Sequence, residues 1–407
     1  MVIERKEQKL GTADNPDVMP MGSEVEVIPE PSRADQIRDA AEILVMEESI
    51  LVDDEADEIS TPDISFDANL VDQVDDGELA ALASDVLSAI KADKESMAAF
   101  SGENAEGYFS LDGNLLIYQA HDGDSLCDQI YTMDLSTRKT KLVSTGLGVT
   151  TCAYFQHPKC DNIIYASTHL GGSACPPKPD YSKGYVWKLY PDYDIFKSTK
   201  DGKILEQMTD SPGYDAEATV AFDGSKVLYT SITSGDLEVW SMNTDGSNKT
   251  QLTNRLGYDG GAFFNSTATK IVWRVYHPKT EKEIADYKAL LIENSIRPMA
   301  LQIWTMNADG TNKKQVTNNE AANFGPYFFP NSNRIIFSSN LHDPKGRDFD
   351  LYAINVDGTG LERVTYFNGF DGFPMFSPDG KYLVFASNRN QIKRGDTNLF
   401  IAEWNYK

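Results

Sequence analysis

The 407-residue chain has few histidines, few cysteines and a deficit of positive charge. Its five histidines offer few nitrogen ligands for a transition metal, and its four cysteines lack the Cys-x-x-Cys spacing of a zinc site. Lys and Arg number 37 against 62 Asp and Glu, a formal net charge of −25. Because such a chain repels phosphate groups, we expect neither nucleic acid nor an anionic membrane as its partner.

Long apolar runs and catalytic motifs are also missing. No run approaches the roughly 20 apolar residues of a membrane span, and the first residues, MVIERKEQKLGTADNP, lack the apolar core of a secretory signal. No Gly-x-Ser-x-Gly motif is present, and the glycine pairs lack the lysine of a phosphate-binding loop. From this we expect a cytoplasmic protein, or a periplasmic one if the sequence is that of a mature form with a start Met added.

The excess of negative charge lies in the first quarter of the chain. Residues 1–100 carry 26 Asp and Glu against 7 Lys and Arg. The stretch 53–76 is rich in Asp with little periodicity, which is typical of a solvated linker, while Ser32 and Asp76 each precede an amphipathic helical pattern. We therefore predict that residues 1–95 form an acidic segment, partly helical and partly disordered.

From residue 96 onward the chain repeats one unit, seen most completely in Gly213 to Thr253. Four short apolar runs alternate with polar loops, and two of the connections contain Asp-Gly, which readily adopts the positive φ of a tight hairpin. The unit therefore predicts a four-stranded antiparallel meander. An aromatic residue marks its third strand six times, at spacings of 44 to 65 residues, in Tyr131, Phe196, Trp240, Trp304, Tyr352 and Phe400.

A period of this length with four strands per unit is typical of propeller blades. The last unit lacks a fourth strand, and the repeat places Met97 and Ala98 where that strand is needed. We predict an all-β fold for residues 96–407, a six-bladed β-propeller of four-stranded blades closed by an N-terminal strand. Two longer spacings contain insertions, the loop 170–192 and a helix near 280–294 that opens with a Thr280-x-x-Glu283 capping box.

Three blocks of the repeat carry a family resemblance. Phe376 to Lys381 reads FSPDGK, Met242 to Gly246 reads MNTDG, and Met306 to Asn312 reads MNADGTN, the last two followed by Gln-x-Thr. These blocks resemble the TolB-like six-bladed propeller repeat over residues 96–407. The resemblance implies a cell-envelope location and protein binding through one propeller face. The same repeat also serves in peptidase accessory domains and in polysaccharide-degrading enzymes.

The repeat also predicts which residues gather at one end of the central channel. Six oxygen-bearing side chains fall where the innermost strands begin, namely Asn104, Thr150, Asp215, Asp259, Asn323 and Asp371. Glu106 and Glu217 follow two residues later in their blades. The ends of the second strands are expected at the same channel mouth and bring His121, His169, Arg274, Asn340, Asn388 and Arg389.

Two interpretations of this ring of oxygens are open. In the first, Asp and Asn side chains accept hydrogen bonds from the N–H groups of their own loops and fix the turns between blades. In the second, Asp215, Asp259 and Asp371 hold Ca²⁺ or a chain of waters, since clustered carboxylates repel one another unless a cation or protons neutralise them. One carboxylate can serve both purposes.

His121 and His169 are the only histidine pair that the repeat brings to matching strand ends. With a carboxylate, two histidines could bind a metal for lyase or hydrolase chemistry. Loop histidines that only bond to polar neighbours are the alternative. Cys127, Cys152 and Cys175 fall at the same mouth, so we expect a disulfide from Cys175 to Cys127 or Cys152 if the cysteines are not simply free thiols.

From these patterns we expect a monomeric, non-enzymatic protein- or peptide-binding propeller of the bacterial cell envelope that requires no cofactor. The insertion loop 170–192, with its prolines and aromatics, suits a semi-rigid recognition surface, and the acidic mouth favours a basic group of the partner. One alternative is a metal-dependent carbohydrate-active enzyme with its site near His121 and His169. Another is a propeller that only stabilises a working segment in residues 1–95.

Overall fold

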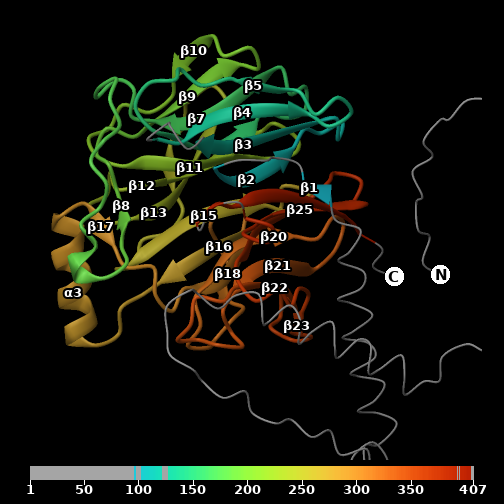
Figure 1. The fold of residues 1–407 in the computed structure, drawn as a ribbon. Coiled ribbons are helices and arrows are strands. Elements are labelled where there is room, and N and C mark those ends of the chain that lie inside the picture. The colour runs from blue at the N-terminus through green and yellow to red at the C-terminus, as the bar shows by residue number, and fades with distance from the viewer. Residues whose placement is uncertain (1–95, 98–101, 122–126, 392, 394, 405–407) are drawn as a thin grey trace, which may run out of the picture. The chain divides into compact units, whose positions relative to one another are not determined.

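The computed structural model describes residues 96–97, 102–121, 127–391, 393 and 395–404. These residues form six four-stranded antiparallel sheets arranged around a central axis (Figure 1). The predicted all-β, six-bladed propeller is therefore confirmed. The two helices predicted within residues 1–95 lie outside the described residues. No helix in the described part of the chain is long and apolar enough to span a membrane.

Each blade runs from an innermost strand at the axis to a short outer strand. Blade 1 consists of β2 (Glu103–Phe109), β3 (Leu115–His121), β4 (Gln129–Asp134) and β5 (Thr140–Leu142). Blade 2 consists of β6 (Thr150–Phe155), β7 (Asn162–Ser167), β9 (Asp194–Thr199) and β10 (Ile204–Gln207). Blade 3 consists of β11 (Asp215–Val220), β12 (Lys226–Ser231), β13 (Glu238–Asn243) and β14 (Thr250–Gln251).

The second half of the ring repeats this order. Blade 4 consists of β15 (Tyr258–Phe264), β16 (Lys270–Tyr276), β18 (Gln302–Asn307) and β19 (Lys314–Gln315). Blade 5 consists of β20 (Asn323–Phe328), β21 (Arg334–Ser339), β22 (Asp350–Asn355) and β23 (Glu362–Arg363). Blade 6 consists of β24 (Asp371–Phe376), β25 (Tyr382–Ser387) and β26 (Asn398–Glu403).

The ring is closed by the N-terminal strand, as predicted. Strand β1 (Ser96–Met97) pairs antiparallel with β26, with Met97 opposite Phe400, and supplies the fourth strand of blade 6. This pairing joins the two ends of the propeller chain in one sheet. The last blade thereby has four strands like the other five, with β1 as its outer edge strand.

Local sequence explains the hairpins. In blade 3, Gly224 takes a φ of 71° in the Asp223-Gly224 turn, and its N–H donates to the carbonyl of Ala221 at 2.8 Å. The Asp223 carboxylate accepts from the Ser225 N–H at 2.9 Å. A Cβ at position 224 would lie 2.4 Å from the carbonyl oxygen of His157 in blade 2, so both the positive φ and the neighbouring blade require glycine here.

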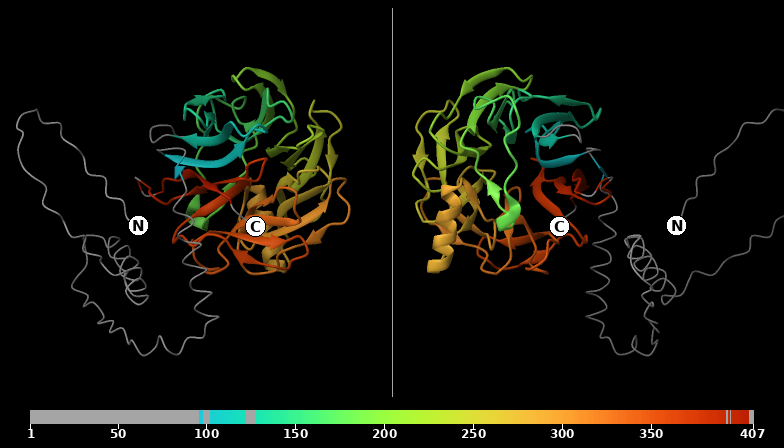
Figure 2. Two further views of the ribbon diagram at one scale, coloured as in Figure 1. Left: turned by 90° about the vertical axis from the view of Figure 1, so that its right-hand side faces the viewer. Right: turned by 60° about the vertical axis from the view of Figure 1, so that its left-hand side comes forward.

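The two insertions meet each other. The insertion of blade 2 contains the short 3₁₀ helix η3 (Tyr181–Lys183) and strand β8 (Trp187–Lys188), and that of blade 4 contains α3 (Glu281–Ile292) and strand β17 (Ser295–Ile296). Strands β8 and β17, labelled beside each other in Figure 1, pair antiparallel into a small sheet of their own. The right-hand view of Figure 2 shows the blade 2 insertion in green and helix α3 in orange. Thr280 and Glu283 form the predicted capping box of α3, which confirms the helix expected from the sequence.

The core lies between the blades. All six residues of β11 and of β20 are buried, as expected for innermost strands packed on both faces. Buried aromatic and β-branched side chains from the second and third strands, such as Tyr165, Phe337 and Phe385, fill the space between successive sheets. Packing between blades therefore positions the innermost strands around the axis.

Candidate functional site

Every innermost strand carries a β-bulge at the same position. The strand register shifts once in each blade, and the residue two positions after the predicted ring residue takes a φ between 52° and 59°. Such left-handed conformations cost about 1–3 kcal/mol for a non-glycine residue and cluster at functional sites. The six bulge residues are Glu106, Cys152, Glu217, Gly261, Gly325 and Phe373.

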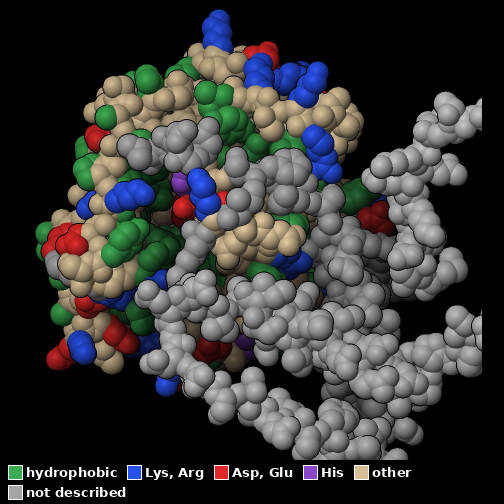
Figure 3. Space-filling view, viewed as in Figure 1, with side chains coloured by type: hydrophobic (Ala, Val, Ile, Leu, Met, Phe, Trp, Pro, Cys, Tyr) green, Lys and Arg blue, Asp and Glu red, His purple; other side chains and the backbone are tan. Residues whose placement is uncertain are grey.

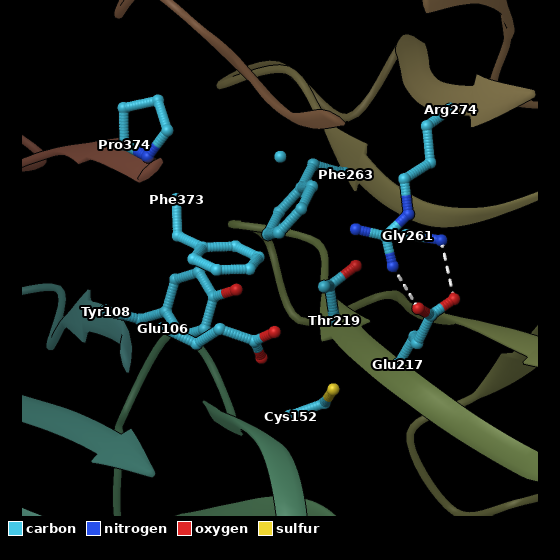
Figure 4. A pocket seen from close by; sticks show the side chains of 11 residues that line it. Glu106, Tyr108, Cys152, Glu217, Thr219, Gly261, Phe263, Arg274, Phe373 and Pro374 are labelled. Atoms are coloured by element: carbon cyan, nitrogen blue, oxygen red, sulfur yellow. Dashed lines mark hydrogen bonds and ion pairs between the residues drawn. The ribbon is translucent and has the colours of Figure 1, made fainter. Parts of the chain in front are cut away.

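The bulges turn these six residues toward the axis, where they line one cavity. Its remaining walls come from Tyr108, Thr219, Phe263, Arg274 and Pro374. The cavity volume is about 30 Å³, enough for about two water molecules or the end of one side chain. Figure 4 shows the Glu106 and Glu217 carboxylates, the Cys152 thiol and the Arg274 guanidinium around this space.

Glu217 is already neutralised within the cavity wall. Its carboxylate forms an ion pair with the guanidinium of Arg274, and both side chains are almost fully buried. The carboxylate also accepts from Thr230 Oγ1 at 2.6 Å and from the Gly261 N–H at 2.8 Å. The Tyr258 hydroxyl lies 3.1 Å from both carboxylate oxygens and accepts from Arg274 Nε at 2.8 Å. Three further polar groups, from Thr230, Tyr258 and Gly261, thus hold this pair in one geometry.

Two glycines make room for this pair. A Cβ at Gly260 would lie 2.6 Å from Glu217 Oε2, and one at Gly261 would lie 3.0 Å from Arg274 Cζ. Burial would lower the pKa of Arg274, but Tyr258 and Glu217 outweigh it and raise that pKa well above the ordinary value. Arg274 therefore remains charged inside the cavity wall.

Glu106 is the second carboxylate of the cavity, and it makes no ion pair with any described residue. Burial raises the pKa of Glu106 to about 7, although Arg274 and a hydrogen bond from Cys152 act in the opposite direction. Burial, together with the negative charge of Glu106, raises the pKa of the Cys152 thiol. Cys152 is therefore a neutral thiol rather than a thiolate nucleophile, and Glu106 is the cavity group whose charge changes near neutral pH.

The insertions cover the channel mouth beside this cavity. The ring of Trp187, in β8, lies 4.8 Å from the guanidinium carbon of Arg274 and packs edge-on against Tyr258. A disulfide between Cys127 and Cys175 ties the blade 2 insertion to the loop between β3 and β4 of blade 1. Of the two pairings expected for Cys175, the structure contains the one with Cys127, and Cys152 and Cys160 are free.

The six predicted ring residues all lie at the first or second position of the innermost strands and are buried. Three of them bond to uncharged groups nearby. Thr150 Oγ1 lies 3.0 Å from Ser167 Oγ, Asn323 donates to the Leu301 carbonyl at 2.7 Å, and Asn104 donates to the Thr397 carbonyl at 3.2 Å. Asn104 and Asn323 thus join neighbouring blades, but by donating to carbonyls of the preceding blade rather than by accepting from N–H groups of their own loops as expected.

The three ring aspartates have separate partners. Asp259 accepts from Trp273 Nε1 at 2.7 Å and bonds to His277 Nε2 at 2.8 Å. Asp371 accepts from Arg389 Nη2 at 2.7 Å, and Asp215 accepts from Ser211 Oγ at 2.6 Å.

The structure does not bring Asp215, Asp259 and Asp371 together as ligands of one ion. Among the described residues, the only group of three or more His, Cys, Asp or Glu with ligand atoms within 4.8 Å of one another is His342, Asp348 and Asp350.

His121 and His169 do not occupy equivalent positions. His121 pairs with Glu103 across β2 and β3, whereas His169 lies two residues beyond Ser167, which pairs with Thr150. The register therefore offsets the two histidines by one residue. His121 Nδ1 lies 2.6 Å from Asp128 Oδ1, and His169 Nδ1 lies 3.0 Å from Ser167 Oγ. Each histidine therefore bonds to a polar neighbour, which agrees with the alternative to a metal site given in the sequence analysis.

Sequence reasoning named Glu106, Glu217 and Arg274 but placed Arg274 at a strand end. The structure pairs Arg274 with Gly260, inside the sheet, and its side chain reaches into the cavity wall. Cys152 was expected at this mouth only as a possible disulfide partner of Cys175, and Phe373 was not predicted there. The only sequence signal for the six bulges is the glycine at positions 261 and 325, where a left-handed conformation has no steric cost.

Comparison with known proteins agrees with the fold. No family model and no curated protein matches the chain. Among solved structures, a putative TolB from Agrobacterium tumefaciens matches 75% of this chain and 91% of its own, with 16% identity and a TM-score of 0.48. An oligogalacturonate lyase in complex with manganese matches 76% of this chain and 93% of its own, with 12% identity and a TM-score of 0.44.

Hydrazine synthase from Kuenenia stuttgartiensis matches 79% of this chain and 46% of its own, with 12% identity and a TM-score of 0.50. These similarities are too distant to transfer an activity, since one propeller fold serves many functions. The six-bladed propeller that the TolB-like repeat implied is the fold that the structure itself shows.

Proposed function

We propose that this chain is a non-enzymatic binding propeller of the bacterial cell envelope that holds a protein or peptide partner at its channel mouth. A basic side chain or terminal ammonium group of the partner enters the axial cavity beside Glu106. The observation that carries this proposal is that only one of the two cavity carboxylates has a counter-ion. Glu217 has Arg274 as its counter-ion, whereas Glu106 has no ion-pair partner among the described residues.

The walls of the cavity suit a cation. Tyr108, Phe263 and Phe373 line it together with Glu106, and aromatic faces attract ammonium and guanidinium groups. A bound cation favours the ionised form of Glu106 and so lowers its pKa from about 7. The small cavity admits only the end of a side chain, so most of the partner's contacts would lie outside it.

The insertions supply apolar surface for those contacts. Leu170, Tyr181 and Tyr185 of the blade 2 insertion and Ile292 and Met299 of the blade 4 insertion are all more than half exposed. Figure 3 shows hydrophobic side chains exposed in the region that β8 and α3 occupy in Figure 1. Exposed aromatic and aliphatic side chains beside charged groups are typical of protein-binding surfaces.

The disulfide between Cys127 and Cys175 supports an envelope location, because disulfides persist in oxidising compartments such as the periplasm. The TolB-like fold points the same way. Fractionation of the native cells, with the chain detected in the periplasmic or membrane fraction, tests the location. Recovery in the cytoplasm with both cysteines reduced would contradict it.

A peptide library tests the binding site. Members that carry Lys or Arg at one position are compared with members that carry norleucine or citrulline there, and binding to the full chain is measured by fluorescence anisotropy. We expect the basic peptides to bind more tightly, and Glu106→Gln to remove that difference. Glu403→Gln, an exposed residue at the end of β26 outside both insertions, is the matched control. Equal binding of basic and neutral peptides would reject the cavity as the binding site.

A carbohydrate-active enzyme near His121 and His169 remains the alternative from the sequence, and nothing in the geometry favours it. Simultaneous substitution of both histidines by alanine separates the two functions. Loss of a turnover found by substrate screening, with peptide binding intact, would establish the enzyme in place of the binding module.

A further inference from the structure

The six interfaces between blades share one arrangement near the channel mouth. In every interface the backbone N–H of the ring residue donates, at 2.7–3.1 Å, to the carbonyl that precedes the third strand of the previous blade. The first residue of that third strand therefore lies beside the ring residue. In three interfaces both residues are acidic: Asp194 with Asp215, Glu238 with Asp259, and Asp350 with Asp371.

Two buried carboxylates repel each other unless positive charge or a proton lies with them. The interface between blades 5 and 6 has two arginines. Arg363 Nε donates to Asp350 Oδ2 at 2.8 Å, and Arg389 Nη2 donates to Asp371 Oδ2 at 2.7 Å. The interface between blades 3 and 4 has His277, with Nε2 at 2.8 Å from Asp259 Oδ2.

The strand register identifies the equivalent positions between blades 2 and 3, and both are neutral. Arg363 faces Tyr352, the second residue after Asp350, and Gln207 faces Phe196, the second residue after Asp194. Gln207 Nε2 donates to Asp194 Oδ2 at 3.0 Å.

The second arginine position is neutral as well. Arg389 and His277 each lie two residues beyond the partner of their ring aspartate, and the equivalent residue beside Asp215 is Thr233. The interface between blades 2 and 3 therefore has a carboxylate pair but no cationic side chain at either position.

One carboxylate oxygen in this interface has no partner. Asp215 is 1% exposed, and its Oδ1 accepts no hydrogen bond, while its Oδ2 is bonded to Ser211. The hydroxyl of Thr209 lies between the two carboxylates, but it accepts from the Ile195 N–H at 2.9 Å and donates to Asp194 at 3.3 Å, so it has no second proton for Asp215.

The other charged groups nearby do not balance the pair. Asp210 adds negative charge next to Asp194, and the exposed Lys249 acts on Asp215 without forming an ion pair among the described residues. Asp371 also has an unpaired Oδ1, but Arg389 balances its charge.

We propose that the interface between blades 2 and 3 binds Ca²⁺, a hard divalent cation, between Asp194 and Asp215. The ion supplies the positive charge that two arginines supply at the equivalent positions between blades 5 and 6. Near Asp215, oxygen ligands are available from Asp194 and from the hydroxyls of Thr209, Ser211 and Ser231, and oxygen is the ligand type that Ca²⁺ prefers. Asp194 is partly exposed, so water and the ion can reach the site from the surface. This site differs from the Ca²⁺ site expected from the sequence, because both carboxylates come from one interface.

Calorimetric titration of the metal-free full chain with CaCl₂, and thermal unfolding with and without Ca²⁺, test this site. We expect one bound ion per chain and a higher melting temperature with Ca²⁺. Asp215→Asn is expected to weaken binding by at least roughly tenfold, because it removes one of two charged ligands. Asp371→Asn, which alters the arginine-balanced interface, should leave Ca²⁺ affinity unchanged.

A second variant tests the site while both carboxylates, Asp194 and Asp215, stay in place. Gln207→Arg introduces the guanidinium that Arg363 supplies to Asp350, at an exposed position, and is expected to abolish Ca²⁺ binding while keeping the protein folded. Gln251→Arg places the same side chain at the equivalent position of blade 3 and is the matched control. The proposal is overturned if the wild type binds no Ca²⁺ at millimolar concentration, as expected for a shared proton, or if Gln207→Arg binds it unchanged.

Discussion

The indole of Trp187 lies over the guanidinium of Arg274, with 4.8 Å between the ring centre and Cζ. The two residues come from different parts of the chain: Trp187 belongs to the insertion of blade 2, and Arg274 belongs to the second strand of blade 4. Arg274 also pairs with Glu217 of blade 3. One cationic side chain therefore links the axial cavity to the structure that covers the channel mouth.

Removal of this contact is expected to loosen the cover and leave the propeller folded. Trp187→Ala should lower stability by about 0.5–2 kcal/mol, the range of a partly desolvated cation–π contact. It should also weaken the binding of basic peptides, which is measured by anisotropy beside a denaturant titration. Tyr382→Ala, which removes an exposed aromatic of β25 outside both insertions, is the control. Equal losses in both variants would show that Trp187 has no special role.

A second prediction concerns the disulfide between Cys127 and Cys175. Cys127 and Cys175 are separated by 48 positions, and a cross-link over a loop of that length stabilises a protein by about 2–4 kcal/mol. Reduction of the wild type, or Cys175→Ser, should therefore lower the free energy of unfolding by this amount and expose residues 176–186 to limited proteolysis. The same reductant should not affect Cys175→Ser, which already lacks the bond. A reductant effect of equal size on that variant would contradict the assignment.

The elements that depend on local sequence were predictable. Asp-Gly turns, alternating apolar residues and the Thr280 capping box specify hairpins and a helix within a few residues, and the missing last strand indicated closure by the N-terminal strand. The bulges were not predictable, because Glu106, Cys152 and Phe373 are residue types that seldom adopt a positive φ. Arg274 was expected at a strand end, but β16 continues to Tyr276 and so places Arg274 inside the sheet.

The contact between the two insertions was also beyond sequence reasoning. Pairing of β8 with β17 joins segments about a hundred residues apart, and neither strand has more than two residues. Such short strands form only because the blades hold their ends close together. The position of Trp187 over Arg274 follows from that tertiary arrangement.

The ionisation of Glu106 predicts a pH dependence of binding and of stability. Its pKa is raised from 4.5 to about 7 in the folded protein, so a cationic peptide should bind more tightly as the pH rises through 7 and the carboxylate ionises. Stability follows the opposite course. A raised carboxyl pKa favours the folded state below pH 4.5, and this contribution is lost as the pH rises through 7.

Glu106→Gln should remove both effects, with a change in the pH dependence of unfolding of about 1–3 kcal/mol between pH 4.5 and 7. Denaturant titrations of the wild type and the variant across this range measure the difference. Parallel stability curves for the two proteins would show that Glu106 has an ordinary pKa in the folded state.

Glu238 provides the sharpest test of the blade interfaces. Burial, together with Asp259 and Asp236, raises its pKa to about 8, and its Oε2 is buried without a hydrogen-bond partner. The equivalent residues of blades 1 and 4 are Gln129 and Gln302, whose amide groups donate to the backbone carbonyls of Gly148 and Asn319 at 2.9 Å and 2.8 Å. The repeat therefore already contains a neutral side chain that fits this position.

Glu238→Gln is expected to stabilise the protein at and above pH 8 by about 1–3 kcal/mol, because it removes a buried negative charge beside Asp259. The raised pKa means that the wild type is favoured below pH 4.5 and loses stability as the pH rises through 8. The advantage of the variant should therefore grow between these values and then remain constant. Glu362→Gln, an exposed residue of β23, is the control and should change stability little at any pH. A variant less stable than the wild type at pH 9 would mean that Glu238 is ionised and fully paired in the folded state, and that the interface between blades 3 and 4 has a counter-charge other than His277.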